Sequence, residues 1–187
     1  MDIKTSIKIF SKDEAMDLAY RLGFEYEQQV HYCPQACFAA LQDVFHFKDD
    51  TLFKSLFGFH GGSGDSGIGN CGALVGGIAA ISYFFGRTRA EFDLGIENCH
   101  ATGLVKKLVD LFKKEFNGIR CRDCQKVMFG RELDFWKEED RAFFEEMKGH
   151  EEKCPHVVGT GAKLAASVLW DELHNPERIS KKVPKYS

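Results

Sequence analysis

A glycine-rich loop that leads into one cysteine, and then into a helix of small residues, constrains this chain most. Residues 58–85 read GFHGGSGDSGIGNCGALVGGIAAISYFF. The small residues after Cys71 let neighbouring helices pack closely, although glycine weakens a helix. Glycines in the loop let backbone N–H groups point at an anion such as a thiolate. The segment therefore predicts a central helix that runs to about Phe85 and has a sulfur site at its start.

The same loop contains a formal G-x-G-x-x-G match at residues 62–67. A dinucleotide fingerprint needs a strand before the loop and a βαβ unit around it, and the sequence predicts neither. The Lys-Ser/Thr pair of a P-loop is absent as well. We therefore interpret the loop as a backbone cradle for sulfur.

The hydrophobic spacing predicts helices along the whole chain and no strand of any length. Ser11 and Glu14 form a capping box that opens the first helix. The expected helices are 12–30, 34–47 with Cys33 as its N-cap, 50–57, 71–85, 98–116, 121–129, a charged segment at 134–148, and 154–174. The fold class is thus all-α, a single-domain bundle of about six to eight helices. We expect the domain to cover residues 1–175 and a mobile tail to cover 176–187.

Charge and hydropathy exclude several classes of partner. The formal net charge of −3 does not suggest a nucleic-acid footprint. The longest apolar run, residues 73–85, is shorter than the ~20 residues of a membrane span. Residues 1–10 lack the apolar core of a signal peptide. We expect a cytoplasmic protein without nucleic-acid or membrane partners, and a homodimer could form through the small apolar helix.

Seven cysteines are many for a chain without secretion signals. Four of them share a local position at or just before a predicted helix start: Cys33, Cys71, Cys121 and Cys154. Free N–H groups and the helix dipole favour negative charge there, and helix N-termini lower the pKa of cysteine. If these helices converge, they bring four thiolates together.

Four thiolates suit an iron–sulfur cluster or a tetrahedral zinc ion. Cys37 lies one turn after Cys33, and Cys124 forms a C-x-x-C pair with Cys121, so both are candidates for additional ligands. Gln125 follows Cys124 where covalent c-type haem needs His, which argues against covalent haem. A further set of possible ligands consists of His31, His60, His100 and His156.

Four segments in this order resemble the redox-active protein family named for the signature C_GCAxxG_C_C. They are residues 32–36 (YCPQA), residues 71–76 (CGALVG) after the glycine loop, residues 116–122 (FNGIRCR), and Cys154 with its alanine-rich helix. The resemblance implies a small helical redox protein. A similar module in split-Soret cytochromes carries an iron–sulfur centre, and that role would fall on Cys33, Cys71, Cys121 and Cys154.

Three functions remain open at this stage. The first is an iron–sulfur protein for electron transfer or redox sensing, with a redox partner that the sequence does not identify. The second is a thiol–disulfide oxidoreductase that uses Cys121 and Cys124 as catalytic residues. The third is a zinc-stabilised module that binds another protein.

Overall fold

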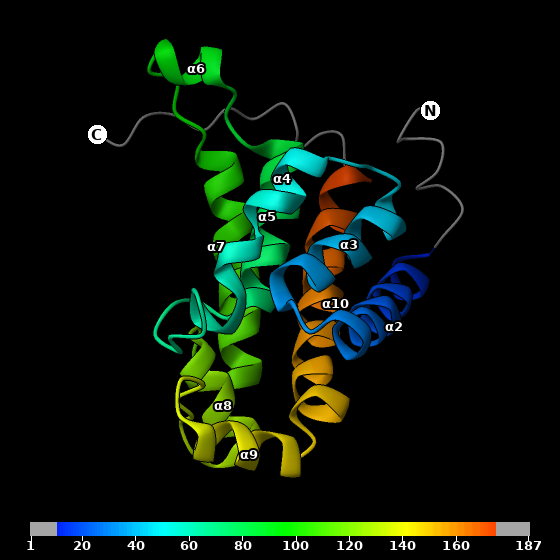
Figure 1. Cartoon of the computed structure of the whole chain (residues 1–187). Coiled ribbons are helices and arrows are strands. Elements are labelled where there is room, and N and C mark those ends of the chain that lie inside the picture. Colours follow the sequence, from blue (N-terminus) through cyan, green and yellow to red (C-terminus); the bar gives the residue numbers. More distant parts are fainter. Residues whose placement is uncertain (1–10, 175–187) are drawn as a thin grey trace.

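The computed structural model describes residues 11–174, which form helices joined by turns (Figure 1). The all-α prediction is confirmed. The α-helices are α2 (Lys12–Val30), α3 (Cys33–Phe45), α4 (Asp50–Ser55), α5 (Gly72–Phe85), α6 (Arg89–Asp93), α7 (Cys99–Phe116), α8 (Cys121–Phe129), α9 (Glu138–Glu146) and α10 (Cys154–Leu173). A 3₁₀ segment, η1 (Phe57–Gly62), and a π-helical turn, η2 (Gly149–Lys153), complete the set. The tail expected at 176–187 lies outside the described residues.

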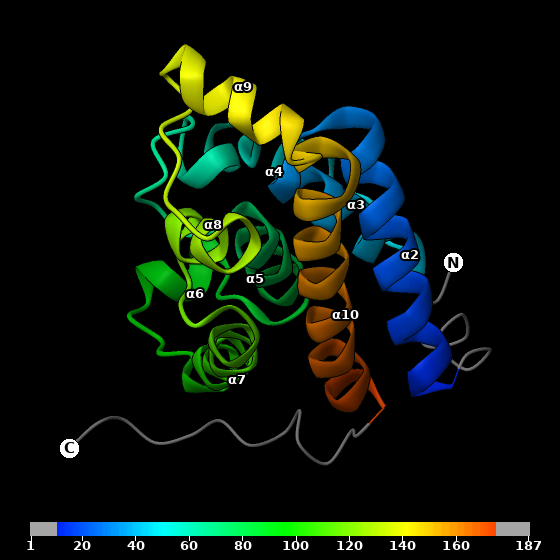
Figure 2. The same ribbon diagram turned by 90° about the horizontal axis from the view of Figure 1, so that it is seen from below.

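Helices α5 and α10 form the middle of the bundle. Helix α5 packs against α3, α7 and α10, and α10 packs most extensively against α2 (Figure 2). Ala73 of α5 and Ala162 and Ala165 of α10 are completely buried. These short side chains let the two helices approach closely, as the small-residue pattern predicts.

The helix boundaries follow local signals to within a few residues. Ser11 forms the predicted capping box with Glu14, whose backbone N–H donates to the Ser11 hydroxyl over 3.2 Å. Cys33 is the first helical residue of α3 rather than its N-cap, which is Tyr32. Helix α3 ends at Phe45, two residues before the predicted end, because His46 adopts a left-handed conformation.

One helix was not predicted. Residues 86–97 lie between the expected helices 71–85 and 98–116, yet they contain α6. Thr88 caps this helix in a capping box with Glu91, whose carboxylate accepts a hydrogen bond from the Thr88 N–H over 2.8 Å. The Thr-x-x-Glu pattern was present in the sequence and could have indicated this start.

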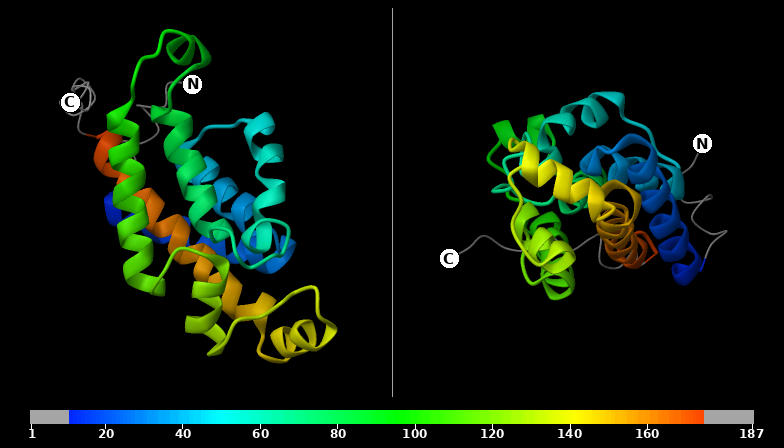
Figure 3. Two further views of the ribbon diagram at one scale, coloured as in Figure 1. Left: turned by 90° about the vertical axis from the view of Figure 1, so that its left-hand side faces the viewer. Right: turned by 60° about the horizontal axis from the view of Figure 1, so that its bottom comes forward.

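The two ends of the bundle differ in character. Helix α6 projects from one end, whereas α8, α9 and the start of α10 gather at the other (Figures 1 and 3). Loop 63–70 also reaches α8, because Asn70 and Arg120 form an isolated antiparallel bridge. The starts of α3, α5, α8 and α10, each with its cysteine, meet at the end that carries α8 and α9.

Candidate cysteine site

Five cysteines line one cavity of about 370 Å³. Cys33 begins α3, Cys71 is the N-cap of α5, Cys154 begins α10, and Cys121 and Cys124 belong to α8. Cys71 and Cys124 are buried, and the other three are partly accessible. The four cysteines singled out by their helix-start positions are thus brought together, and Cys124 joins them.

The rest of the cavity wall contains both apolar and ionisable side chains. The apolar ones are Met128, Phe129, Phe135, Phe144, Val157 and Val158. Asp65, Arg141, Glu145 and His150 supply charged or ionisable groups. The indole of Trp136, also in the wall, donates to the Gly64 carbonyl over 3.3 Å and so ties the segment before α9 to the glycine loop.

The glycine loop fixes Cys71 and Cys121 relative to one another. The Cys71 N–H donates to the Ile119 carbonyl over 2.8 Å, and the Cys121 N–H donates to the Gly69 carbonyl over 3.0 Å. Gly62 has a φ of +76°, and a Cβ on this residue would lie 2.7 Å from the Cβ of Cys121. Only glycine suits both the conformation and the close approach.

The first residue of α5 is equally constrained. A Cβ on Gly72 would overlap the Cys33 sulfur and lie 2.7 Å from Cδ of Pro34. The start of α3 can therefore lie directly against the start of α5 only because residue 72 has no side chain. This is the position at which the chain departs from the pattern GCAxxG.

The predicted lowering of cysteine pKa holds for Cys71 alone. A hydrogen bond from Cys124 lowers the pKa of Cys71, and the N–H groups of Ala73 and Leu74 at the start of α5 act in the same direction. The partner thiol, Cys124, has a raised pKa because it is the donor in this pair. In the metal-free protein, Cys71 is thus the thiol that ionises most readily among the five.

For Cys33, Cys121 and Cys154 the prediction of a lowered pKa is wrong. Burial raises the pKa of all three thiols, and negative charge on neighbouring groups raises it further. The Gly61 N–H partly offsets this for Cys33 by donating a hydrogen bond to it. Desolvation outweighs the helix dipole at these three positions.

Cys154 also differs from the prediction in its backbone. The π-helical turn η2 runs into α10 without a break, and the Cys154 N–H donates to the Gly149 carbonyl. Cys154 therefore does not occupy a free helix N-terminus. The Cys-Pro pattern that it shares with Cys33 indicated a new helix start, and the turn before it has no strong signal in the sequence.

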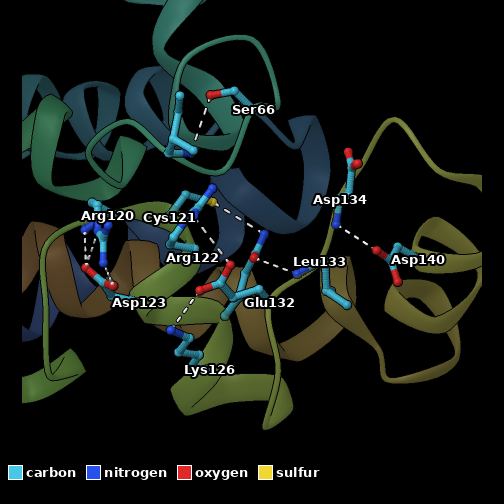
Figure 4. A network of polar contacts seen from close by, with 12 residues as sticks. Ser66, Arg120, Cys121, Arg122, Asp123, Lys126, Glu132, Leu133, Asp134 and Asp140 are labelled. Carbon is cyan, nitrogen blue, oxygen red and sulfur yellow. Dashed lines mark hydrogen bonds and ion pairs between the residues drawn. The ribbon is translucent and has the colours of Figure 1, made fainter.

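A polar network holds the start of α8 (Figure 4). Asp123 accepts hydrogen bonds from the backbone N–H groups of Ile119 and Arg120, over 3.2 and 3.0 Å, and pairs with the Arg120 guanidinium over 2.8 Å. The Arg120 hydrogen bond is the main reason why the pKa of Asp123 is lowered to about 2. The carboxylate thus caps the helix that carries Cys121 and Cys124.

Gln125 is the buried polar residue of α8 next to the thiols. Its amide nitrogen lies 3.7 Å from the Cys121 sulfur and donates to it, and its amide oxygen accepts from the Leu133 N–H over 2.9 Å. At 3 % exposure, the side chain is almost fully removed from solvent. Sequence analysis considered Gln125 only as the residue that is not histidine, and missed its link between a cysteine and the chain before α9.

The other candidate ligands lie elsewhere. Cys37 is completely buried in the core, outside the cavity wall, and Cys99 begins α7. None of the four histidines considered in the sequence lines the cavity, whereas His150 does. His31 contacts the His150 ring at a centroid distance of 4.0 Å.

The donor chemistry of the cavity fits a metal–sulfur centre. Five thiols surround the space, and one oxygen of Glu27 in its wall is buried without a hydrogen-bond partner. Within residues 11–174, however, no three Cys, His, Asp or Glu side chains are arranged around one point as a single metal ion would require.

Across residues 11–174, no helix combines the length and the hydrophobicity that a membrane crossing would need.

In the comparison with protein families, the model described as "Putative redox-active protein (C_GCAxxG_C_C)" matches residues 31–168. The match begins two residues before Cys33 and includes the other four cysteines of the cavity. No curated protein and no solved structure matches this chain.

Proposed function

Because the chain belongs to the C_GCAxxG_C_C family of redox-active proteins, we propose that it transfers electrons or senses redox state through a bound iron–sulfur cluster. The observation that carries this proposal is the meeting of Cys33, Cys71, Cys121 and Cys154 on one cavity wall. Such a cluster, when bound, supplies one-electron chemistry. Cys124 offers a fifth thiolate.

The residues around the sulfurs have roles that suit such a centre. Gln125 and the Gly61 N–H donate hydrogen bonds to the sulfurs of Cys121 and Cys33. Such donors stabilise thiolate charge and tune reduction potential. Apolar side chains in the cavity wall, such as Phe129 and Val158, also affect the potential by lowering the local polarity.

The size of the cavity and the number of thiols in its wall favour a cluster over zinc. Tetrahedral zinc needs four sulfurs at about 2.3 Å from one point. Five thiols line a cavity of about 370 Å³, which is more space than one metal ion fills. Several metal atoms bridged by sulfide span a wider space than one ion, so the proposal is a cluster and zinc is the alternative.

Reconstitution without oxygen tests the proposal. The reduced protein is incubated with ferrous iron and sulfide, desalted, and examined by visible absorption. We expect broad absorption from wild type and from Cys99→Ala, whose thiol lies outside the cavity, and its loss from Cys71→Ala. A wild-type protein that stays colourless, or a Cys71→Ala protein with the full wild-type spectrum, would contradict the proposal.

One contact favours thiol–disulfide exchange as a second candidate. The structure pairs Cys124 with Cys71 through a hydrogen bond, whereas the sequence had suggested Cys121 with Cys124. In this function the Cys71 thiolate attacks a substrate disulfide, breaks its S–S bond and releases one thiolate, which takes a proton from solvent. Cys124 then gives up its proton and displaces the second substrate thiol, so the substrate gains two electrons and a Cys71–Cys124 disulfide forms.

The pH dependence of alkylation tests this second candidate in metal-free, reduced protein. Cys71 has the lowered pKa, so it should be labelled at a lower pH than Cys121, as followed residue by residue by mass spectrometry. Mild oxidation should then give a Cys71–Cys124 disulfide. Earlier labelling of Cys121, or a different disulfide, would exclude this pairing.

A further inference from the structure

The cysteine cavity contains one acidic side chain that the proposed ligand set leaves without a role. Glu27, near the end of α2, lines the cavity and is only 2 % exposed. Its Oε2 atom is buried and has no hydrogen-bond partner among the described residues. A buried carboxyl oxygen without a partner costs free energy and calls for an explanation, and a bound ion is one that fits a cavity lined by thiols.

The fold holds Glu27 in this position. Gly23, one turn earlier on the same face of α2, lies against α10, where a Cβ would be 3.2 Å from the Val158 carbonyl oxygen. Gln28 donates to the Glu151 carbonyl in η2 over 2.7 Å. The end of α2 is thus fixed against the turn that leads into Cys154, and Glu27 faces the thiols rather than solvent.

The Glu27 carboxyl group and the cavity thiols raise one another's pKa, because each becomes negatively charged when it ionises. Burial, with the negative charge of Cys71, raises the pKa of this carboxyl to about 8. Glu27 in turn contributes to the raised pKa of Cys33, Cys121 and Cys154. Each of these acidic groups makes the ionisation of the others less favourable, and a metal cation among them would reverse that effect for all of them.

We infer that the Glu27 carboxylate is an oxygen ligand of the metal centre held by the cysteine thiolates. Carboxylate oxygen is a common ligand for iron and zinc. This inference rests on the proposed function. It adds that the ligand set is mixed, with sulfur ligands from α3, α5, α8 and α10 and an oxygen ligand from α2. Coordination gives the partnerless Oε2 atom a partner, and the positive charge of the metal favours the ionised form of the carboxyl group.

The test compares metal retention with the stability of the metal-free fold. Wild type, Glu27→Gln, Glu27→Asp and the control Glu25→Gln, on the exposed face of the same helix, are reconstituted with iron and sulfide without oxygen. Iron release to an excess of chelator is then timed by absorption. We expect release to be at least tenfold faster from Glu27→Gln and unchanged in Glu25→Gln, with Glu27→Asp between them.

Urea unfolding of the same metal-free proteins separates a ligand from a structural residue. Removing a buried acidic group should leave metal-free Glu27→Gln as stable as wild type or more stable, while its metal is held less tightly. Equal release rates and spectra for wild type and Glu27→Gln would overturn the inference alone, as would a Glu27→Gln protein whose metal-free fold is also weakened. A wild-type protein that takes up no metal would overturn the proposed function itself.

Discussion

Two glycines without a Cβ atom let the backbone pack directly against the cysteines of the site. Gly72 lets the Cys33 sulfur lie against α5, and Gly62 lets the loop pass over Cys121. Neither position has space for a methyl group. The shape of the cavity therefore depends on glycine at positions 62 and 72 as well as on the cysteines.

Gly72→Ala should destabilise the metal-free protein by about 1–3 kcal/mol, because the new methyl group would overlap the Cys33 sulfur. Equilibrium unfolding in urea measures this. The matched control is Gly103→Ala, in α7, where a Cβ meets nothing within 4 Å; it should gain about 0.5–1 kcal/mol from helix propensity. Equal effects of the two substitutions would show that Gly72 is not needed for packing.

Gln125→Leu should cost about 1–3 kcal/mol, because it leaves the Leu133 N–H buried without an acceptor. With a cluster bound, it should also lower the reduction potential, since a donor to the Cys121 sulfur is lost. Urea unfolding and a redox titration measure the two effects. Gln29→Leu, on the exposed face of α2, serves as the control; an identical potential in both variants would refute the role of Gln125.

Between elements, a single hydrogen bond ties the exposed sides of α2 and α3 together. The Tyr26 hydroxyl donates to the Asp43 carboxylate over 2.6 Å. This bond, with smaller contributions from burial and charge, raises the pKa of Tyr26 to about 12. The pair helps to hold α2, and with it Glu27, against the helix that begins with Cys33.

Tyr26→Phe should lower stability by about 1 kcal/mol at neutral pH. The folded pKa lies above the usual value near 10, so the contribution is complete below about pH 10 and is lost as the pH rises through about 12. Urea unfolding and phenolate absorbance against pH measure both effects. Tyr83→Phe is the control, because the phenylalanine ring can still stack on Phe47. If a tyrosine with a pKa of about 12 were still observed in Tyr26→Phe, the assignment of that pKa to Tyr26 would be wrong.

Helices could be predicted where a capping residue or a glycine marks their ends. The site residues that were missed, Glu27 and Gln125, have no local sequence signal of this kind. Ser11 with Glu14, and Gly130 after α8, mark ends that the structure confirms. The π-helical turn before Cys154 and the positions of Glu27 and Gln125 depend on packing between distant segments. Sequence spacing places Glu27 one turn from Gly23, but it does not show that this face of α2 meets the cysteines.

For the molecule as a whole, the arrangement of helices explains why cysteines so far apart in the sequence share one cavity. Helices α3, α5 and α10 pack on one another, and the bridge between Asn70 and Arg120 brings α8 to the start of α5. The shared helix-start position of four cysteines pointed to a common site, but only the packing shows that Cys124 lines the cavity and that Cys37 does not.

The most direct measurement is the content of iron and acid-labile sulfide in protein purified entirely without oxygen and never reconstituted. We expect iron and sulfide in similar, stoichiometric amounts per chain, and their loss when Cys33, Cys71, Cys121 or Cys154 is replaced by alanine. Protein that contains neither iron nor sulfide, with its cavity thiols all free, would contradict the proposed function.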